Sequence, residues 1–328
     1  MTEKIAHNLY RIPVPLPGNP LRELNAYVIR GSERTLLIDT GFRMDACREA
    51  LRAGLEDLEI PREEITVLLT HMHSDHAGLG PEFVGQRRPI LVSDIDRVRL
   101  EQFPTKSGRS KNASRELFAR AGFAPAKLDL VETSNPAFAL APVDFERYES
   151  LRDGQLLSLD GNHLRCIMVP GHTPGQMCFY IEEEEIMFTG DHVLFDITPN
   201  ITAWSEIPDS LGNDMESLRK IAKYDVRLAL PGHRRPGDMA QRVVQLLDHH
   251  QERLEEVLGL VRNNPESSGY HLASLMSWRI RANSWDDFPL AQKWFAVGEC
   301  LAHLDHLLKL GQIRRELDGA GIYRYFME

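Results

Sequence analysis

The sequence is short of cysteine, of basic residues and of long apolar runs. Its 328 residues include four cysteines, and 38 lysines and arginines stand against 48 aspartates and glutamates, for a formal net charge of −10. The cysteines form no CxxC pair, which argues against a disulfide framework. The acidic excess argues against a nucleic-acid binder. Because no apolar run has the length of a transmembrane helix or a signal peptide, we expect a cytoplasmic protein without membrane association.

What the sequence does contain is one dense group of metal-ligand side chains. The apolar run at residues 65–69 predicts a buried strand, which ends at Thr70. Four ligand-type side chains follow within six positions, namely His71, His73, Asp75 and His76. A strand that ends in a tight loop fixes the backbone, so these side chains can converge on one point. A polar surface loop with incidental histidines is the alternative, and the density of ligands argues against it.

This group, His-x-His-x-Asp-His, resembles the signature of the metallo-β-lactamase superfamily, a large set of metal-dependent hydrolases. Three further elements follow in the order typical of that family: VPGHTPG at residues 169–175, FTGD at residues 188–191 and LPGH at residues 230–233. The resemblance runs from residue 5 to about residue 233. It implies an αββα sandwich, and the alternation of predicted strands and helices in this part of the chain also favours an α/β sandwich with helices outside the sheets.

The resemblance also implies two divalent metal ions. Its ligand set places His71, His73 and His172 on one ion and Asp75, His76 and His233 on the other, with Asp191 bridging the two. Two such ions would lower the pKa of a bridging water from about 15.7 toward about 7, which makes hydroxide available at neutral pH. We expect Asp75 and Asp191 to be catalytic as well as metal-binding. The absence of thiolates leaves the identity of the metal open, and we expect zinc, with iron and manganese as alternatives.

Four residues outside the ligand set are candidates for supporting roles. The resemblance implies that Asp39 orients the metal-binding histidines from outside, although an ordinary turn aspartate is the alternative. His192, beside Asp191, is either structural or a general acid. Phe195 and Trp204 lie just after Asp191 in a stretch with little periodicity, and we expect them to line the substrate pocket.

We expect two domains, at residues 1–237 and 238–328. The second begins with an amphipathic helix at residues 238–261, followed by two helices and two short strands. This order resembles the C-terminal winged-helix domain of one branch of the superfamily. Its last helix, residues 289–310, offers only Lys293 and Lys309, so we expect a packing, dimerisation or pocket-wall role rather than DNA binding.

A helical insertion is expected at about residues 101–149 of the first domain. It carries five basic residues, namely Lys106, Arg109, Lys111, Arg115 and Arg120. Either this is a solvated surface insertion, or it is a cap over the metal site that attracts an anionic small-molecule substrate.

Three functions remain open. The all-His/Asp ligand set resembles the glyoxalase II-like branch, and it favours a dinuclear hydrolase that uses a metal-bridging hydroxide on a thioester, ester or lactone. A thiolate or alkoxide can leave while bound to a metal, whereas an amine needs a proton donor, and His192 is the candidate in sight. The alternative is a phosphodiesterase or endoribonuclease with the same site. The third is a non-enzymatic winged-helix regulator that carries metal.

Overall fold

The computed structural model describes residues 2–102, 109–134, 139–279, 282 and 284–328. It divides into two compact units. The first comprises residues 1–106, 136–199 and 217–243, and the second comprises residues 107–135, 200–216 and 244–328. This division differs from the expected one, because residues 107–135 of the expected insertion group with the second unit instead of the first.

The larger sheet of the first unit has seven strands in chain order. They are β1 (Glu3–Ala6), β2 (Leu9–Pro15), β3 (Glu23–Arg30), β4 (Thr35–Ile38), β5 (Ile65–Leu68), β6 (Ile90–Ser93) and β7 (Tyr148–Leu151). Strands β1 to β4 pair antiparallel, and β4 to β7 pair parallel. Strands β1 and β2 are separate because Asn8 has a φ of 58° and turns the chain between them.

The smaller sheet of the first unit has five strands in the order β12-β11-β10-β9-β8. They are β8 (Leu156–Leu159), β9 (Asn162–Met168), β10 (Met177–Ile181), β11 (Ile186–Gly190) and β12 (Leu228–Pro231). Only β11 and β12 pair parallel. The two sheets share a core that includes Leu36, Phe179 and Phe188, each at most 1% exposed. Every residue of β10 is buried, as expected for a strand covered on both faces.

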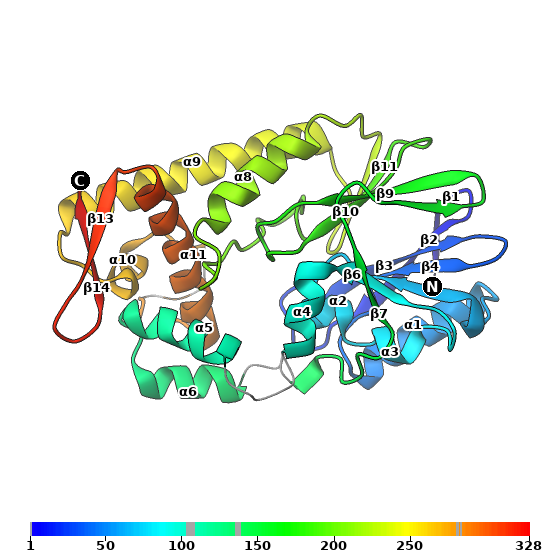
Figure 1. Ribbon diagram of the computed structural model, residues 1–328, viewed down its shortest axis with the longest axis horizontal. Helices are drawn as coiled ribbons and strands as arrows, with labels where there is room; N and C mark the ends of the chain where they lie inside the picture. The colour runs from blue at the N-terminus through cyan, green and yellow to red at the C-terminus, as the bar shows by residue number, and fades with distance from the viewer. Residues whose placement is uncertain (1, 103–108, 135–138, 280–281, 283) are drawn as a thin grey trace. The chain divides into compact units, whose positions relative to one another are not determined.

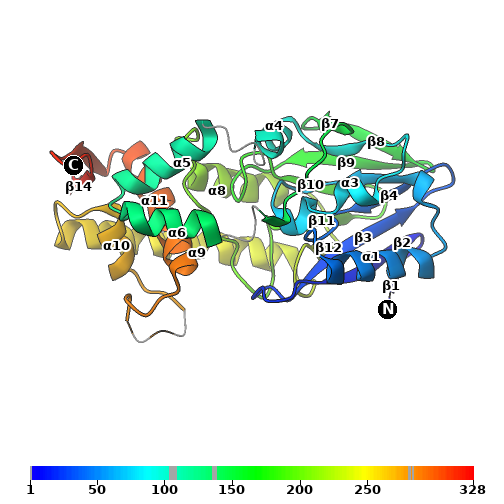
Figure 2. The ribbon, with the colours of Figure 1, turned by 90° about the horizontal axis from the view of Figure 1, so that it is seen from below.

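Helices cover the outer faces of both sheets (Figures 1 and 2). The first unit contains α1 (Asp45–Asp57), α2 (Ser74–Ala77), α3 (Gly80–Phe83), α4 (Asp94–Gln102) and the ends of α8 (Ser210–Ile221) and α9 (Met239–Asn263) that belong to it. Helix α1 lies close against β2, because a Cβ at Gly54 would stand 2.6 Å from Ile12 Cγ2. On the outer side of the smaller sheet Cys178 and Met187 are fully buried. The first unit is therefore an αββα sandwich.

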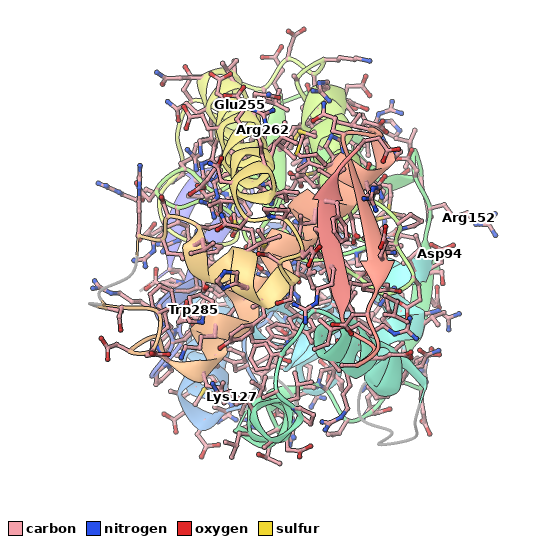
Figure 3. All side chains as sticks on the ribbon, turned by 90° about the vertical axis from the view of Figure 1, so that its left-hand side faces the viewer. Asp94, Lys127, Arg152, Glu255, Arg262 and Trp285 are labelled. Atoms are coloured by element: carbon pink, nitrogen blue, oxygen red, sulfur yellow. The ribbon has the colours of Figure 1, made fainter. Side chains whose placement is uncertain are left out.

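The second unit is mainly helical. It contains α5 (Arg109–Arg120), α6 (Pro125–Ser134), most of α9, α10 (Gly269–Leu275), α11 (Leu290–Lys309) and the hairpin of β13 (Ile313–Leu317) and β14 (Tyr323–Met327). Tryptophans pack against its core. Trp294 stacks on Phe118 with ring centroids 4.9 Å apart, and Trp285 packs edge-on against Tyr270 (Figure 3).

The basic cluster expected at residues 106–120 is only partly described. Lys106 and the side chains of Arg109 and Lys111 lie outside the described part of the chain. Arg115 pairs with Asp129, and Arg120 pairs with Glu116. The two described members thus have acidic partners, and the choice between a solvated insertion and a cap over the metal site stays a prediction.

Two expectations drawn from what the sequence lacks can be compared with the structure. All four cysteines are buried and free, and burial raises the pKa of the Cys47 thiol to about 11 and that of Cys166 to about 12. Across the described residues, no helix combines the length and the apolar composition that crossing a bilayer requires.

Candidate metal centre

The seven predicted ligands all lie just beyond strand ends at one edge of the sandwich. His71, His73, Asp75 and His76 follow β5, His172 follows β9, Asp191 follows β11 and His233 follows β12. Backbone hydrogen bonds join these loops, since Met177 N–H donates to Thr70 O (2.8 Å) and Gly232 N–H donates to Gly190 O (2.8 Å). Ligands from four separate places in the chain therefore meet at one site.

Three imidazole nitrogens converge in the first part of the site. His73 Nδ1 lies 3.1 Å from His71 Nε2 and 3.0 Å from His172 Nε2. Two neutral imidazole lone pairs cannot hydrogen-bond to each other, so such an arrangement needs a proton or a cation between them. Two nitrogens bound to one tetrahedral zinc ion lie about 3.3 Å apart, given a Zn–N bond of about 2.05 Å. The triad fits a metal ion.

The second part of the site combines imidazoles with a carboxylate. His233 Nε2 lies 3.3 Å from His76 Nε2 and 3.3 Å from Asp75 Oδ2. Asp75, His76 and His233 form a second group whose ligand atoms all lie within 4.8 Å of one another. This mixture of nitrogen and oxygen ligands suits a borderline divalent cation.

Asp191 lies between the two groups. Its Oδ1 is 3.5 Å from His76 Nε2, and its Oδ2 is 3.8 Å from His172 Nε2 and 3.5 Å from His233 Nε2. Oδ1 is buried and has no hydrogen-bond partner. A buried carboxylate oxygen without a donor is costly unless a cation meets it. The geometry fits the bridging position, while the ligand assignment as a whole stays a prediction.

Hydrogen bonds from outside the cluster fix which imidazole nitrogens face inward. Asp39 Oδ2 accepts hydrogen bonds from His76 Nδ1 (2.8 Å) and Thr70 Oγ1 (2.7 Å), and Thr70 Oγ1 in turn contacts His71 Nδ1 (3.0 Å). The chain passes Asp39 in a left-handed conformation, with a φ of 59°. His233 Nδ1 donates to Glu23 O (2.7 Å). Each of these three histidines therefore presents Nε2 to the centre.

Burial and charge set the protonation of the site in opposite directions. Burial is the main cause that lowers the pKa of His71 well below its usual value and that of His73 to about 3, so both are neutral ligands at pH 7. Burial also opposes a charge on His76, but Asp39, Asp191 and Asp75 outweigh it and raise its pKa well above the usual value. The same carboxylates would favour a metal cation at His76 Nε2.

Asp75 is ionised at neutral pH. Burial opposes this, but the charge of His76 and the hydrogen bond from His233 prevail and lower its pKa to about 2. The pKa of Asp191 is lowered in the same way, against its burial, by His233 and His76. Two carboxylates thus stay charged in a buried site, which is the environment that a pair of divalent ions would neutralise.

One buried carboxylate that the sequence did not suggest supports this site. Asp96, in the first turn of α4, is fully buried and accepts hydrogen bonds from Met72 N–H (3.0 Å), Thr173 Oγ1 (2.7 Å) and Gly175 N–H (2.9 Å). It therefore joins the loop of His71 and His73 to the loop of His172. Burial raises its pKa to about 6, although these three donors act against the rise.

Two side-chain amides hold the remaining ligand loops. Asn25 Nδ2 donates to Pro231 O and Arg234 O, both at 2.9 Å, on either side of His233. The surroundings of Gln176 orient its amide so that the oxygen accepts from Asp191 N–H (3.0 Å) and His192 N–H (2.6 Å). Asn25 lies far from every motif, and Gln176 directly follows the VPGHTPG motif at residues 169–175 without belonging to it, so the sequence analysis singled out neither residue.

The structure separates the three remaining candidates. His192 is buried beside Asp191, at 1% exposure, and its role as support or acid stays a prediction. Phe195 belongs to the first unit, where a Cβ at Gly237 would stand 2.6 Å from its ring. Trp204 belongs to the second unit, where its backbone bridges to Ile207. A pocket role for the two aromatic residues remains untested.

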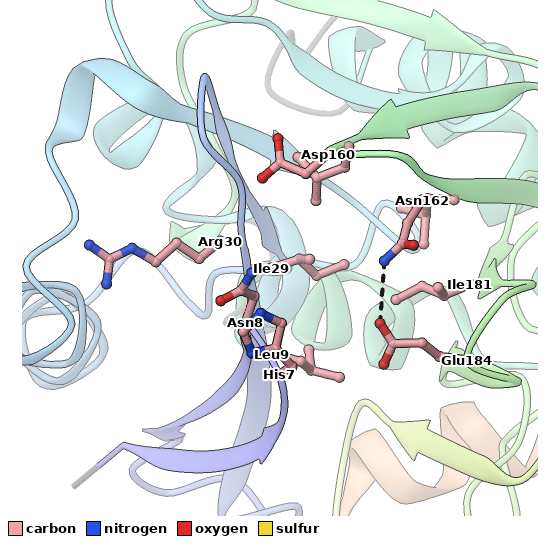
Figure 4. A pocket seen from close by; sticks show the side chains of 11 residues that line it. His7, Asn8, Leu9, Ile29, Arg30, Asp160, Asn162, Ile181 and Glu184 are labelled. Carbon is pink, nitrogen blue, oxygen red and sulfur yellow. Dashed lines mark hydrogen bonds between the residues drawn. The ribbon is translucent and has the colours of Figure 1, made fainter.

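A larger cavity lies at the other end of the sandwich and is unrelated to the ligands. It has a volume of about 390 Å³ and is lined by turns β1–β2, β8–β9 and β10–β11, including His7, Asp160 and Glu184 (Figure 4). On its wall Asn162 Nδ2 donates to Glu184 Oε1 (3.3 Å). None of the seven predicted ligands contacts it.

Comparison with known proteins agrees with the fold. The sequence model of the metallo-beta-lactamase superfamily matches residues 20–233, and a second, described as metallo-beta-lactamase-like C-terminal domain, matches residues 285–328. An atrochrysone carboxyl ACP thioesterase from Aspergillus fumigatus is 31% identical over 77% of this chain and 65% of its own length. A lactamase-like protein from Aspergillus niger is 29% identical over 80% and 66%. The chain thus spans about 65% of these curated relatives.

Solved structures match along nearly the whole chain. A metallo-beta-lactamase family protein from Thermus thermophilus has a TM-score of 0.83 and 31% identity, covering 99% of this chain and 100% of that one. A beta-lactamase domain protein from Burkholderia ambifaria has a TM-score of 0.84 and 27% identity, covering 100% and 94%. The αββα fold, the match at residues 20–233 and these neighbours agree, and the chain belongs to the metallo-beta-lactamase superfamily.

Proposed function

We propose that the protein is a metal-dependent hydrolase that cleaves a thioester, or an ester or lactone of similar reactivity. The observation that carries the proposal is the convergence of seven histidine and aspartate side chains, with no thiolate among them, at one edge of the sandwich. The similarity to a fungal acyl carrier protein thioesterase supports a thioester as the substrate class.

The residues present would hold two divalent ions. His71, His73 and His172 would bind one, Asp75, His76 and His233 the other, and Asp191 would contact both. Two bound ions supply Lewis acidity toward the substrate carbonyl and lower the pKa of water from about 15.7 toward about 7. Zinc suits this donor set, and iron or manganese would fit it as well.

Side chains and backbone of the protein orient the imidazole rings, and one carboxylate can accept a proton. Asp39 and Glu23 O fix the rings of His76 and His233 through their Nδ1 atoms, so the inward nitrogens do not rotate away. Asp75, with a pKa of about 2, is an ionised carboxylate that can accept a proton from water at the site. Hydrolysis adds water across the C–S bond and yields an acid and a thiol.

The leaving group favours a thioester over an amide. A thiol with a pKa of about 8.5 leaves readily as the thiolate, whereas an amine leaves only after nitrogen is protonated. The carboxyl groups of this site, Asp75 and Asp191, both have lowered pKa values and make poor proton donors. The site is therefore suited to a substrate whose leaving group departs without being protonated, such as a thiolate.

The second unit has a supporting role in this proposal. The order α9, α10, α11, β13 and β14 supports a winged-helix assignment for its C-terminal part. We propose a packing role for it, with a homodimer as the form to look for by gel filtration with light scattering.

The test is a substrate panel on protein of known metal content. Metal should be measured first, and about two equivalents per chain are expected. Acyl thioesters, a lactone and bis-p-nitrophenyl phosphate should then be compared, with a chelator-stripped sample as control. We expect thioester cleavage that chelation abolishes and zinc restores. Faster cleavage of the phosphodiester than of every thioester would favour the phosphodiesterase alternative and reject the proposal.

A further inference from the structure

A second group of charged side chains lies directly beyond His233. A pocket of about 250 Å³ is lined by Arg11, Leu21, Arg22, Glu23, Arg234 and Arg235. Four arginines thus line one small pocket of a chain whose formal net charge is −10. We propose that this pocket binds an anionic group of the substrate, a carboxylate or a phosphate, and so selects acidic thioesters over neutral ones. The inference rests on the proposed hydrolase function and names its substrate class.

Two of the four arginines are already occupied by neighbouring groups. Arg11 donates to Asn25 Oδ1 (2.6 Å) and pairs with both Glu3 and Glu23, so these three charged side chains together leave one negative charge. Arg235 makes one ion pair, at 3.6 Å to Asp196, and its side chain is 86% exposed. A long pair at such an exposed site is weak, so Arg235 can exchange this partner for a bound anion.

Arg22 and Arg234 supply the positive charge that is left over. Among the described carboxylates, none forms an ion pair with either guanidinium. Arg234 Nη2 donates to Pro20 O (2.8 Å), while its Nε is buried without an acceptor. A buried donor without an acceptor is destabilising, and an oxyanion would satisfy it. Arginine also presents the planar fork that binds carboxylates and phosphates through two parallel hydrogen bonds.

The loop that carries Arg22 is formed before any ligand arrives. Leu16 N–H donates to Arg22 O (2.7 Å), Arg22 N–H donates to Asn19 O (3.0 Å) and Leu21 N–H donates to Asn19 Oδ1 (2.9 Å). Arg22 and Arg234 both adopt the left-handed conformation, with φ values of 71° and 64°. Side chains other than glycine rarely do so, and such residues concentrate at ligand sites. A preformed loop also loses little entropy on binding.

The pocket borders one of the candidate ligands from behind. The backbone carbonyl of Glu23, one of its lining residues, accepts the hydrogen bond of His233 Nδ1 at 2.7 Å, and Arg234 follows His233 in the chain. The Nε2 atom of the same ring faces the metal centre, so the imidazole of His233 stands between the two places. The proposal therefore expects a substrate whose acidic group and cleaved carbonyl lie on either side of this ring.

The experiment compares two thioesters that differ in one group. The butyryl and succinyl thioesters of N-acetylcysteamine have acyl chains of the same length, and only the second ends in a carboxylate. The ratio of their kcat/KM values should favour the succinyl thioester in the wild-type protein. Arg22→Gln should lower that ratio about fivefold to tenfold through a higher KM, which is the range for one charge-assisted contact at a partly exposed site.

Three further variants make the result specific. Arg22→Lys keeps the charge and should retain part of the preference. Arg235→Gln changes an exposed side chain and gives an independent measurement if Arg22→Gln folds poorly. Arg152→Gln removes an exposed arginine of the first unit that lies outside the pocket (Figure 3), and it should leave the ratio unchanged. Melting temperature and metal content are measured for every variant.

The outcomes separate this inference from the function beneath it. If both thioesters are cleaved but the ratio is the same in wild type, Arg22→Gln and Arg235→Gln, the pocket does not select for charge and the hydrolase proposal stands. A wild-type preference for the butyryl thioester also overturns the inference. If the metal-loaded wild type cleaves neither thioester, both proposals fall together.

Discussion

The two ends of the β-sandwich differ in the polar side chains that they gather and in the burial of these side chains. Strands β9, β10 and β11 connect them. One end has the larger void, about 390 Å³, and its polar residues His7, Arg30 and Asp160 are exposed. The other end has its histidines His71, His76 and His233 fully buried and pressed against carboxylates. The difference teaches that a cavity and a convergence of buried ligand-type side chains can lie at opposite ends of one sandwich, and the proposed active site rests on the second.

Close backbone packing brings the ligand loops together. At the ligand end a Cβ on Gly190 would stand 2.8 Å from Thr70 Cβ, and one on Gly232 would stand 2.6 Å from Asp191 Oδ1. Close contacts also occur beside the cavity, where a Cβ on Gly31 would stand 2.5 Å from Leu159 Cδ1, whereas one on Gly161 would meet nothing within 4 Å. Close packing alone therefore does not separate the two ends, and the ligand-type side chains on the packed loops do.

The largest effect should come from removing the carboxylate between the two ligand groups. Asp191→Ala should lower kcat/KM by at least about 10³-fold and reduce bound metal to half or less, because both ions lose a ligand. Glu184→Gln, on the wall of the cavity, is the matched control and should keep full activity and metal. A fully loaded and active Asp191→Ala protein would contradict the bridging role.

Adding one methyl group should lower activity at a tightly packed glycine and leave activity unchanged at an open one. Gly232→Ala places Cβ 2.6 Å from Asp191 Oδ1 and 2.8 Å from His76 Cε1, so one of the two ligands must move. A displacement of about 1 Å at a reactive site lowers activity by about 100-fold. Gly259→Ala, in α9 with open space around it, should leave activity intact and stabilise the helix by up to about 1 kcal/mol. Equal activity in both variants would refute the packing argument.

The ligand residues were predictable because each follows a buried apolar strand and stands in a recognisable motif. The same holds for the strands themselves, which local apolar runs specify. Strand β7 was not expected, since Glu149 and Ser150 interrupt it and leave no apolar run. Asp96 was missed for a different reason. Its partners Met72 and Thr173 are 24 and 77 residues away, and nothing in the neighbouring sequence indicates them.

In the insertion, the sequence indicated a feature that the structure changes. That feature is the cluster of basic residues. The sequence placed Arg115 and Arg120 in one basic cluster, but Asp129 and Glu116 compensate them in the fold. The arginines that remain uncompensated, Arg22 and Arg234, are 212 positions apart by number and have no cluster in the sequence. Of the pairs named here only Arg120 with Glu116, at i,i+4 in one helix, follows from spacing along the chain. The rest of the charge balance depends on which side chains meet in space.

A smaller effect on metal binding is expected from Asp96, whose carboxylate joins two ligand loops but is not itself a predicted ligand. Asp96→Asn keeps the shape but replaces one acceptor oxygen by a donor facing Gly175 N–H or Met72 N–H. Metal affinity should fall about tenfold, as for other partners behind a ligand shell. The exposed Asp94 of the same helix gives the control, and Asp94→Asn should bind metal like the wild type. Competition with a chromophoric chelator measures both.

The smallest effect on turnover should come from changing Asp209. This residue belongs to a cluster of charged side chains at neither end of the β-sandwich. Asp209 accepts from His306 Nδ1 (3.0 Å), Gly212 N–H (2.7 Å) and Lys309 Nζ (3.0 Å). Burial opposes its ionisation, but these donors lower its pKa to about 2. Because the folded pKa is depressed, the stabilisation is present above about pH 3.8, the unfolded value, and is lost as the pH falls through about 2.

Asp209→Asn should therefore lower the melting temperature at pH 7 by about 2 °C per kcal/mol lost, while kcat/KM below the transition stays the same. The gap between wild type and variant should narrow when melting is recorded at pH 3. A gap that widens on acidification would mean that Asp209 is not held ionised by the fold.

Asn25 gives the N-terminal strands an importance that no ligand list conveys. Its amide bonds to the carbonyls of Pro231 and Arg234, and thereby holds His233 from a position more than two hundred residues earlier. A recombinant fragment that begins after residue 30 would retain every ligand named above and still lose the anchorage of the last one. A fragment that keeps the motifs but lacks Asn25 is therefore expected to lose the position of His233 and with it the complete ligand set.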